Sequence, residues 1–386
     1  MKRVLFVTNG HGEVAIAQRI ATELRTFLAD AQFDHLALVG NQTGATLNDV
    51  GPRRTMPSGG LIAMGNARNL ARDLRAGLLG LTWAQAKFLR KARGSYDAAV
   101  AVGDVYALAM TLLAKTPAVF VGSAKSVDVA PYGPFEERVL MRARLRFVRD
   151  RATALALARH GIDADAANAI VDLFESPNDS RIEPAVTGFV PALALFPGSR
   201  ESAYEDAGFL LEVTRELAAS RPELGAVLSI APGLEAARFA ETARGAGWDV
   251  RQTTSALVPF VMSLRGREIV RGWQGPIGPL LARVALVFGQ AGTANEAAAA
   301  AALPVIAFER ERDRRDRWYR QRQRGLLGEA LAVLPGDLRD AVAGASAILD
   351  DPARRQRMGA IGRERMGDAG AARRIAERIA DLVAQP

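Results

Sequence analysis

The stretch "VLFVTNGHGEVA" (residues 4–15) decides the fold of the first part of the chain. Five apolar or small residues lead into a turn that contains Gly10 and Gly12, and a helical pattern begins near Glu13. A short buried strand, a glycine turn and a helix are the start of a Rossmann-like unit. The two glycines together with Ala15 also match the G-x-G-x-x-G/A fingerprint of a dinucleotide-binding turn.

Two features argue against NAD as the ligand of this turn. The second strand, within "HLALVGNQ" (35–42), ends without the carboxylate that holds a ribose hydroxyl about 20 residues after such a turn. Glu13 also stands where the pyrophosphate would lie, and its carboxylate would repel a phosphate. The turn instead presents His11 and Glu13, both able to transfer protons. A glycine turn with a solvated histidine and a helix-starting glutamate is the structural alternative.

The whole chain alternates short apolar runs with longer helical patterns, which predicts parallel sheets covered by helices on both faces. The proline- and serine-containing stretch "SPNDSRIEPAVTGFVP" (176–191) separates two such series and is the expected linker. The strands expected are 3–8, 35–40, 97–102, 117–121 and 144–149, then 193–197, 226–231, 284–288 and 304–308. The helices expected are 13–28, 66–93, 104–114, 135–143 and 151–160, then 203–219, 234–245, 294–302, 337–350 and 371–384.

Composition limits the class of protein. The 386 residues suffice for two domains, and 49% hydrophobic with 24% charged residues is typical of a globular chain. The absence of cysteine excludes disulfides and thiolate metal sites and fits a reducing cytoplasm. No apolar run approaches the roughly 18 residues of a spanning helix. The short apolar stretch near the start indicates a strand, so we expect no secretory signal there.

Two turns of the second series carry phosphate-binding features. In "LFPGSRESAYED" (195–206), Gly198, Ser199 and Arg200 follow a strand directly, and Ser202 with Glu205 has capping-box spacing. Free backbone N–H groups and a guanidinium at a strand–helix turn suit a diphosphate. The alternative is a turn that only connects the strand to the helix.

The stretch "VFGQAGTANEAAAAAALPVIAF" (287–308) is the stronger signal. Thr293 and Glu296 have capping-box spacing at the start of an alanine-rich helix, and Gly292 allows close approach of a ligand. We expect Thr293 and Asn295 to face a phosphate and Glu296 to accept hydrogen bonds from a ribose. The alternative is that the glycines and the capping box only shape a helix start.

A third strand end carries a carboxylate. "YDAAVAVGDVYALAM" (96–110) is predicted to run as a buried strand, turn at Gly103 and deliver Asp104 at the carboxyl end of the sheet, where doubly wound folds place their chemistry. Asp104 is a candidate general base, and a helix cap at Val105 is the alternative role.

Two segments are strongly basic. Residues 66–93 carry a net charge of +6 with leucines at helical spacing, which suits an anionic lipid surface or, equally, an ordinary amphipathic core helix. Residues 312–324 carry seven arginines interleaved with Trp318 and Tyr319. We interpret the second segment as a solvated charged helix rather than a nucleic-acid contact.

Six motifs taken together resemble the lipid-A-disaccharide synthase-related glycosyltransferases of the GT-B superfamily. They are "TNGHGE", "AVGDVYALAM", "VFVGSAKS", "LFPGSRE", "GQAGTANEAAAAAALPVI" and "GRERMGDAGAARRIAERI", in this order along the chain. The arginine-rich segment at 309–328 departs from the pattern, since relatives have a glycine- and proline-containing turn there. This departure bears on how the nucleobase and the sugar of the donor would be recognised.

The resemblance implies two Rossmann-like doubly wound domains, an acceptor domain at 1–182 and a nucleotide-sugar domain at 192–368, facing across a cleft. A C-terminal helix at 369–386 would return to the first domain. The implied activity is transfer of a sugar, such as an N-acetylhexosamine, from a UDP-sugar to a lipid-linked or phosphorylated acceptor at the cytoplasmic membrane face. No metal or other cofactor is implied.

The resemblance also assigns roles to residues. Asp104 would be the catalytic base, with His11 and Glu13 as competing candidates beside the acceptor-side turn of Asn9, Gly10 and Gly12. The donor would be bound by Gly198, Ser199, Arg200, Gln290, Gly292, Thr293, Asn295 and Glu296. A UDP-sugar 2-epimerase of related fold and a non-catalytic nucleotide-sugar or RNA-binding protein are the alternative functions.

Overall fold

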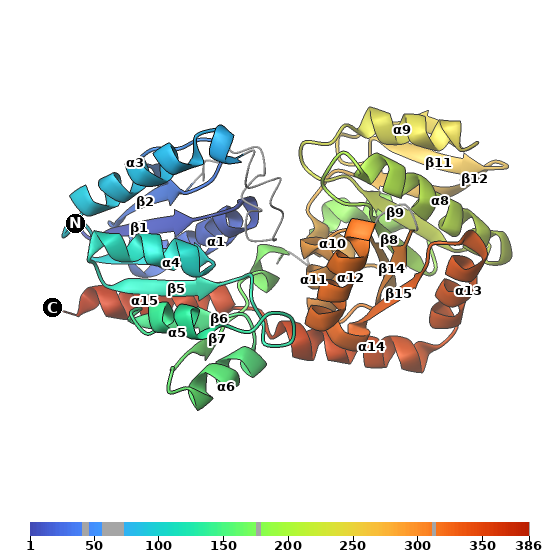
Figure 1. The fold of residues 1–386 in the computed structure, drawn as a ribbon. Helices are drawn as coiled ribbons and strands as arrows, with labels where there is room; N and C mark the ends of the chain where they lie inside the picture. The colour runs from blue at the N-terminus through green and yellow to red at the C-terminus, as the bar shows by residue number, and fades with distance from the viewer. Residues whose placement is uncertain (41–45, 56–72, 175–178, 311–313, 386) are drawn as a thin grey trace. The chain divides into compact units, whose positions relative to one another are not determined.

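The chain folds into two compact units in the structure, which is a computed structural model describing residues 1–40, 46–55, 73–174, 179–310 and 314–385 (Figure 1). The N-terminal unit comprises Met1–Leu173 and Ala369–Pro386, and the C-terminal unit comprises Phe174–Asp368. This division lies earlier in the chain than the linker expected at 176–191. The reason is that α7 (Glu183–Val186) already packs on strands of the second sheet.

A seven-stranded sheet forms the centre of the N-terminal unit, with strand order β3-β2-β1-β4-β5-β6-β7 and every neighbouring pair parallel. Because all strands run the same way, the loops after β1, β4 and β5 emerge at one edge. The strands are β1 (Arg3–Thr8), β2 (Gln32–Ala37), β3 (Asn48–Asp49), β4 (Ala98–Gly103), β5 (Ala118–Gly122), β6 (Leu145–Val148) and β7 (Asp165–Ala166).

Helices cover both faces of this sheet (Figure 1). Leu5, Val7 and Phe120 belong to the buried cluster beneath α3, α4 and α5, while α1 packs beside α15. The α-helices are α1 (His11–Phe27), α3 (Leu78–Lys91), α4 (Val105–Thr111), α5 (Pro134–Leu140), α6 (Arg151–Arg159) and α15 (Ala371–Ala384). The short 3-10 helices are η2 (Leu112–Ala114) and η3 (Val171–Phe174).

One expected helix differs in its bounds. The sequence predicted a helix over 66–93, whereas the described helix α3 begins at Leu78. Gly77 precedes it with φ +91°, a left-handed conformation that interrupts a right-handed helix and that glycine adopts without strain. Residues 66–72 of the prediction lie outside the described residues.

The C-terminal helix α15 is anchored to the N-terminal unit by Asp172. This buried carboxylate accepts hydrogen bonds from the N–H of Gly370, at 2.6 Å, and of Ala372. It therefore caps the first turn of α15, and its negative charge interacts favourably with the positive end of the helix dipole. Asp172 lies next to Leu173, where the chain leaves this unit, and Gly370 lies just after it re-enters. Asp172 thus links the segment that leaves the N-terminal unit to the segment that re-enters it.

The C-terminal unit is built on an eight-stranded sheet of order β10-β11-β12-β9-β8-β13-β14-β15. Its strands are β8 (Ala192–Phe196), β9 (Gly225–Ser229), β10 (Asp249–Gln252), β11 (Phe260–Leu264), β12 (Arg267–Trp273), β13 (Leu286–Gly289), β14 (Val305–Glu309) and β15 (Leu331–Pro335). The pairs β10–β11 and β11–β12 are antiparallel. This arm was not predicted, because residues 246–283 lack the strand–helix alternation of the rest of the chain.

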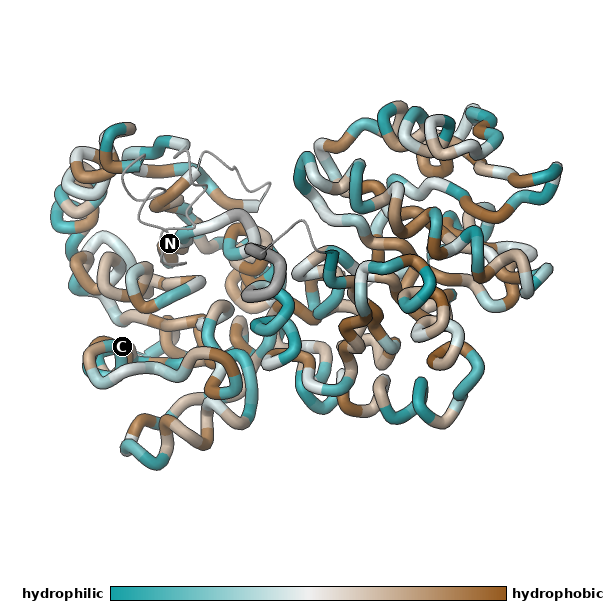
Figure 2. The backbone as a smooth tube through the Cα atoms, turned by 45° about the vertical axis from the view of Figure 1, so that its right-hand side comes forward, coloured by the Kyte–Doolittle hydropathy of each residue, from teal (hydrophilic) through white to brown (hydrophobic). Residues whose placement is uncertain are grey.

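Helices pack on both faces of the second sheet as well. Residues of α8, α9 and α13 join a buried hydrophobic cluster with residues of the strands. Figure 2 shows hydrophobic stretches of backbone in both units. The α-helices are α8 (Ala203–Ser220), α9 (Ala236–Gly245), α10 (Ile277–Leu281), α11 (Thr293–Ala300), α12 (Arg314–Leu327), α13 (Leu338–Leu349) and α14 (Pro352–Met366). The short 3-10 helices are η4 (Ser180–Ile182) and η5 (Gly328–Ala330).

The alanine-rich sequence of α11 is explained by its packing against α14. A Cβ on Gly359 would lie 2.1 Å from the carbonyl oxygen of Ala302, and one on Gly362 would lie 2.5 Å from that of Ala299. The two backbones therefore touch directly, which only small residues on both helices allow. This contact fixes the C-terminal end of α11 against α14.

No helix among the described residues is long and apolar enough to cross a membrane.

We expect Asp172→Ala to destabilise the N-terminal unit by about 1.5–3 kcal/mol, because hydrogen bonds to a buried charge contribute about that much. Hydrogen exchange should show the loss first in the opening turn of α15. Asp381→Ala, an exposed position on the same helix, is the matched control. Equal protection of α15 in both variants would show that Asp172 does not anchor the helix.

Candidate functional site

The loops after β1, β4 and β5 meet at the carboxyl edge of the N-terminal sheet. β1 pairs with β4, and β4 pairs with β5, so the turns that begin at Asn9, Asp104 and Ser123 are neighbours. The backbone N–H of Ser123 donates to the carbonyl of Gly103 at 3.2 Å, which links two of these turns. This edge is where doubly wound folds bind ligands.

Two glycines make room for Glu13 in this edge. A Cβ on Gly10 would lie 2.4 Å from Oε2 of Glu13. A Cβ on Gly103 would lie 2.2 Å from Oδ1 of Asn9 and 3.1 Å from Cγ of Glu13, and Gly103 has φ +133°, which strains any other residue. The first glycine of the G-x-G-x-x-A pattern therefore serves close packing by a carboxylate of its own chain.

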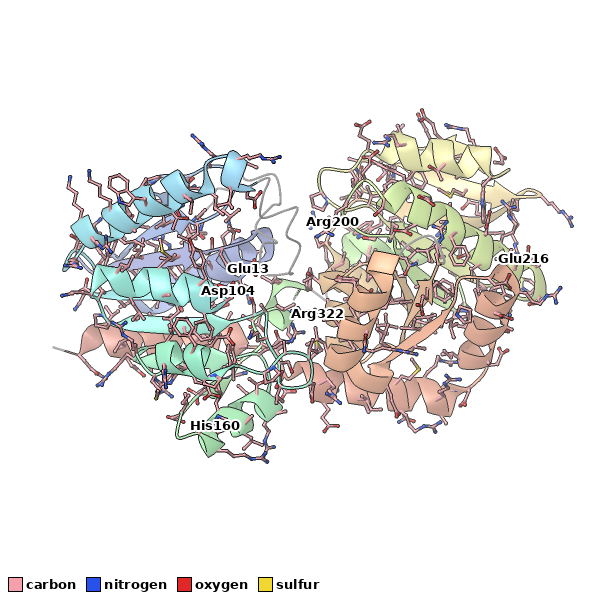
Figure 3. All side chains as sticks on the ribbon, viewed as in Figure 1. Glu13, Asp104, His160, Arg200, Glu216 and Arg322 are labelled. Carbon is pink, nitrogen blue, oxygen red and sulfur yellow. The ribbon has the colours of Figure 1, made fainter. Side chains whose placement is uncertain are left out.

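Glu13 is held in conditions that favour its protonated form. Burial is the main cause that raises the pKa of its carboxyl above the ordinary 4.5, and the negative charge of Asp104 raises it further. A hydrogen bond from its own backbone opposes this, as does one from the hydroxyl of Ser123 at 3.4 Å. Glu13 and Asp104 lie at neighbouring strand ends (Figure 3). A carboxyl whose pKa is raised holds its proton more readily, which suits a group that exchanges protons with a substrate.

Asp104 has a structural role as a helix cap, in addition to any chemical role. Its Oδ1 accepts a hydrogen bond from the N–H of Ala107 at 3.1 Å, so it is the N-cap of α4. The capping alternative is therefore present in the structure, and a role as base stays a prediction. Gly12 is exposed at the start of α1, and the side chain of His11 lies outside the described residues.

The surroundings of Glu13 include residues that the sequence did not single out. Ser123 reaches its carboxylate, and Arg149 donates to the carbonyl of Ser123 at 3.2 Å. Ser123 lies in the motif "VFVGSAKS", directly after a predicted strand. This position was the sequence signal that could have identified Ser123 as a site residue.

In the C-terminal unit, the turns after β8 and β13 are neighbours. The two strands pair in parallel, with Gly289 opposite Phe196, and the N–H of Gln290 donates to the carbonyl of Phe196 at 2.8 Å. Gly198 has φ +121°, which turns the chain sharply, and the exposed Ser199 and Arg200 follow it. Arg200 is drawn at this turn in Figure 3.

The start of α11 has no side-chain cap. Gly292 is its N-cap residue, and Thr293 is the exposed first residue of the helix. The capping box expected between Thr293 and Glu296 does not form, because the helix begins at Thr293 itself, one residue too early for Thr293 to be the cap. The box expected between Ser202 and Glu205 is also absent. Glu205 pairs instead with Arg310 at 3.1 Å.

Two of the expected donor-binding residues point into the protein instead. Asn295 is fully buried, and its Nδ2 donates to the carbonyl of Gly289 at 3.0 Å, so it does not face a ligand as expected. Gln290 is buried and bonds both backbone groups of Phe308, donating to the carbonyl at 3.0 Å and accepting from the N–H at 3.3 Å. Both side chains therefore help to hold the turn after β13 together.

Helix α12 contributes residues that the sequence interpretation missed. Arg320 is buried and donates to Oε1 of Gln290, and Gln323 donates to the carbonyl of Ala291 at 2.9 Å. Tyr319 lies against Gly292, and the charges of Glu296 and Arg200 both act on its hydroxyl. This part of the segment is therefore not a purely solvated helix. The side chains of residues 311–318 lie outside the described residues.

Each unit thus contains one candidate site with a different chemical character. In the N-terminal unit, Glu13 and Asp104 form a pair of carboxyl groups suited to proton transfer. In the C-terminal unit, Arg200 and the open start of α11 form an electropositive turn suited to an anion. The described residues contain no cluster of three or more His, Cys, Asp or Glu arranged to hold a metal.

Comparisons with known proteins identify the fold. No protein-family model matches the chain, and neither does any curated protein. A protein from Listeria monocytogenes described as a UDP-N-acetylglucosamine 2-epimerase aligns with a TM-score of 0.62 and 15% identity, covering 98% of this chain and 96% of that one.

Two further solved structures match over nearly the whole chain. UDP-GlcNAc 2-epimerase from Neisseria meningitidis, bound to UDP-GlcNAc, aligns with a TM-score of 0.58 and 12% identity, covering 98% of this chain and 99% of that one. MurG from Acinetobacter baumannii aligns with a TM-score of 0.58 and 13% identity over 99% of both chains. The chain has the GT-B fold of two Rossmann-like α/β domains, as its sequence predicted.

We expect Glu13→Gln to raise the thermal midpoint at neutral pH. The raised pKa means that the folded chain holds this proton more tightly than the unfolded chain, so the wild type loses stability as pH rises from 4.5 through the folded pKa. The stability difference should therefore shrink as pH falls toward 4.5. Thermal unfolding across this range measures it, with Asp30→Asn as the exposed control. A pH-independent difference would remove the titration of Glu13 as its cause.

Proposed function

We propose that this chain is an enzyme that binds a UDP-sugar and acts on its sugar through acid–base chemistry. The observation that carries the proposal is the open start of α11 bordered by Arg200. Neighbours of the same fold are bound to UDP or UDP-GlcNAc according to their descriptions.

Binding of the diphosphate is supported by the turn after β13. The first turn of α11 lacks a side-chain cap, so its backbone N–H groups and the helix dipole favour an anion there. The guanidinium of Arg200, exposed on the neighbouring turn, can make a charge-assisted contact with the same anion. Glu296, one turn into α11, is our candidate partner for the ribose hydroxyls.

Acid–base chemistry is supported by Glu13. A general acid or base works best when its pKa is close to the operating pH, and burial moves the pKa of Glu13 upward in that direction. Asp104 also caps α4 and adds a neighbouring negative charge. We therefore assign proton transfer first to Glu13, whereas the sequence resemblance placed Asp104 first.

Two reactions are compatible with such a site. Epimerisation at C2 of the sugar can proceed by removal of the C2 proton as the C1–O bond to UDP breaks and a C1–C2 double bond forms. UDP then adds back to C1 while a proton returns to C2 on the opposite face, and the two neighbouring carboxyl groups could share these proton transfers. Two of the three solved structures described above are 2-epimerases, so the comparisons favour this reaction. Transfer of the sugar to a lipid-linked or phosphorylated acceptor is the second candidate, supported by the sequence motifs and by the likeness to MurG, a glycosyltransferase.

A binding protein for RNA is the weaker alternative. Arg320 lies in the basic segment that suggested it, but this side chain is buried and bonded to Gln290. A phosphate backbone is recognised by exposed cations. The part of the segment that the structure describes supports the donor-side turn instead.

We expect incubation with UDP-GlcNAc alone to yield an isomeric UDP-sugar, detected by chromatography and NMR. Glu13→Gln should retain UDP binding and lose about 10²–10⁴-fold in turnover, the usual contribution of a positioned acid or base. Asp104→Asn should lose less, because Asn still caps α4.

Other outcomes of this assay change the assignment. Release of UDP only after a membrane extract is added would identify a transferase. A large loss in Asp104→Asn with little loss in Glu13→Gln would exchange the two roles. UDP-sugar binding with no turnover under either condition would leave only a binding function.

Helix α3 supports a peripheral contact with the inner face of an anionic membrane. Leu79 and Trp83 are 71% and 65% exposed, and Nζ of Lys87 lies 5.5 Å from the centre of the Trp83 ring. Their spacing of four residues places all three on one side of the helix. An apolar stripe beside basic residues suits the headgroup region of such a membrane, where we propose that the protein works.

We expect the protein to float with vesicles that contain phosphatidylglycerol and not with phosphatidylcholine alone. Lys87→Ser should weaken this binding about fivefold, because a basic residue near an anionic surface contributes about 1 kcal/mol. Trp83→Ser should weaken it as well, whereas Phe135→Ser, an aromatic residue exposed on α5, should not. Equal binding to both vesicle types would exclude the contact.

A further inference from the structure

Tyr319 brings a hydroxyl group to the start of α11 from a different helix. A Cβ on Gly292 would lie 2.1 Å from this hydroxyl oxygen and 3.4 Å from Cζ of the ring. The hydroxyl therefore takes the space that the side chain of an N-cap residue would occupy. Glycine is required at position 292 because Tyr319 is there.

Buried contacts of the next turn of α12 hold Tyr319 in this place. Arg320, only 3% exposed, donates to Oε1 of Gln290, and Gln323, only 2% exposed, donates to the carbonyl of Ala291. Gln290 in turn bonds both backbone groups of Phe308 on β14. Helix α12 is thus fastened to the two residues that precede Gly292, and Tyr319 adjoins the buried Arg320.

The electrostatic surroundings keep Tyr319 a hydrogen-bond donor. Burial raises the pKa of its hydroxyl above 10, with Glu296 adding to the shift and the charges of Arg320, Arg200 and Arg322 opposing it. The hydroxyl therefore keeps its proton at neutral pH. A neutral phenol surrounded by three cations can donate to an anion without adding a negative charge.

We propose that Tyr319 donates a hydrogen bond to the diphosphate of the bound nucleotide and so belongs to the donor site. This inference rests on the proposed function, which places the diphosphate at α11. An anion that accepts from the open N–H groups of the first turn comes within reach of a hydroxyl that lies on the N-cap residue. The role of α12 is then to supply and fix this ligand-binding group.

The test compares the affinities of the full chain for UDP and for uridine, measured by competition against a fluorescent UDP derivative. Tyr319→Phe keeps the ring and removes only the hydroxyl. It should weaken UDP binding about tenfold, the effect of losing one hydrogen bond to a charged group, and leave uridine binding unchanged. Tyr106→Phe, at a partly exposed phenol on α4, is the control and should change neither affinity.

A second pair of variants tests the contact with Gly292. Gly292→Ala should lower both the thermal midpoint and the affinity for UDP, because its Cβ meets the hydroxyl. In the Tyr319→Phe background the same substitution should cost less stability, since the nearest remaining ring atom lies 3.4 Å away. Equal cost in both backgrounds would contradict the contact on which the inference depends.

The outcomes separate this inference from the proposed function. Wild-type binding of UDP with an unchanged affinity in Tyr319→Phe overturns the inference and leaves the proposed function standing. An equal loss of UDP and uridine binding would assign Tyr319 to ring packing and also overturns it. No binding of UDP by the wild type rejects the proposed function and the inference together.

Discussion

The close approach of the Glu13 carboxylate to Gly10 and Gly103 is the constraint on which the N-terminal site depends. A side chain at either glycine would collide with Glu13 or Asn9, and Gly103 also needs a positive φ. The same packing buries the carboxylate beside Asp104 and raises its pKa. The position of the Glu13 carboxylate and the direction of its pKa shift therefore both follow from its packing in this turn. A turn that could have held a pyrophosphate is occupied by a carboxyl group of the protein.

In the C-terminal unit, a different set of contacts shapes the candidate site at the start of α11. Its helix start at Gly292 has no cap of its own, and small residues on α11 and α14 let those helices touch. The tertiary contacts of Arg320 and Gln323 then bring α12 onto the turn. Hydrogen bonds to buried polar side chains help hold this turn together, because an unpaired buried group costs stability. Gln290 is an example, since its amide bonds both backbone groups of Phe308.

The two units together form a GT-B fold, yet the fold does not select the reaction. Solved structures of this fold include 2-epimerases and MurG, and the site residues must decide between them. The features that bear on the choice are the pair of carboxyl groups in one unit and the exposed Leu79 and Trp83 on α3 of the same unit. The carboxyl pair suits either reaction, whereas a membrane contact would be most useful for a lipid-linked acceptor.

The sequence by itself determined the alternation of strands and helices, because the periodicity of apolar residues reflects burial on a sheet. It also located the turns at Gly10, Gly103 and Gly292, since glycines after apolar runs mark strand ends. It could not predict the antiparallel arm at 249–273, where the pairing is set by partners distant in sequence. Only the tertiary structure decided that Asn295 and Gln290 point inward and that Tyr319 reaches α11. The direction of a side chain depends on which helix packs beside it, and that information lies in contacts between segments rather than in any one of them.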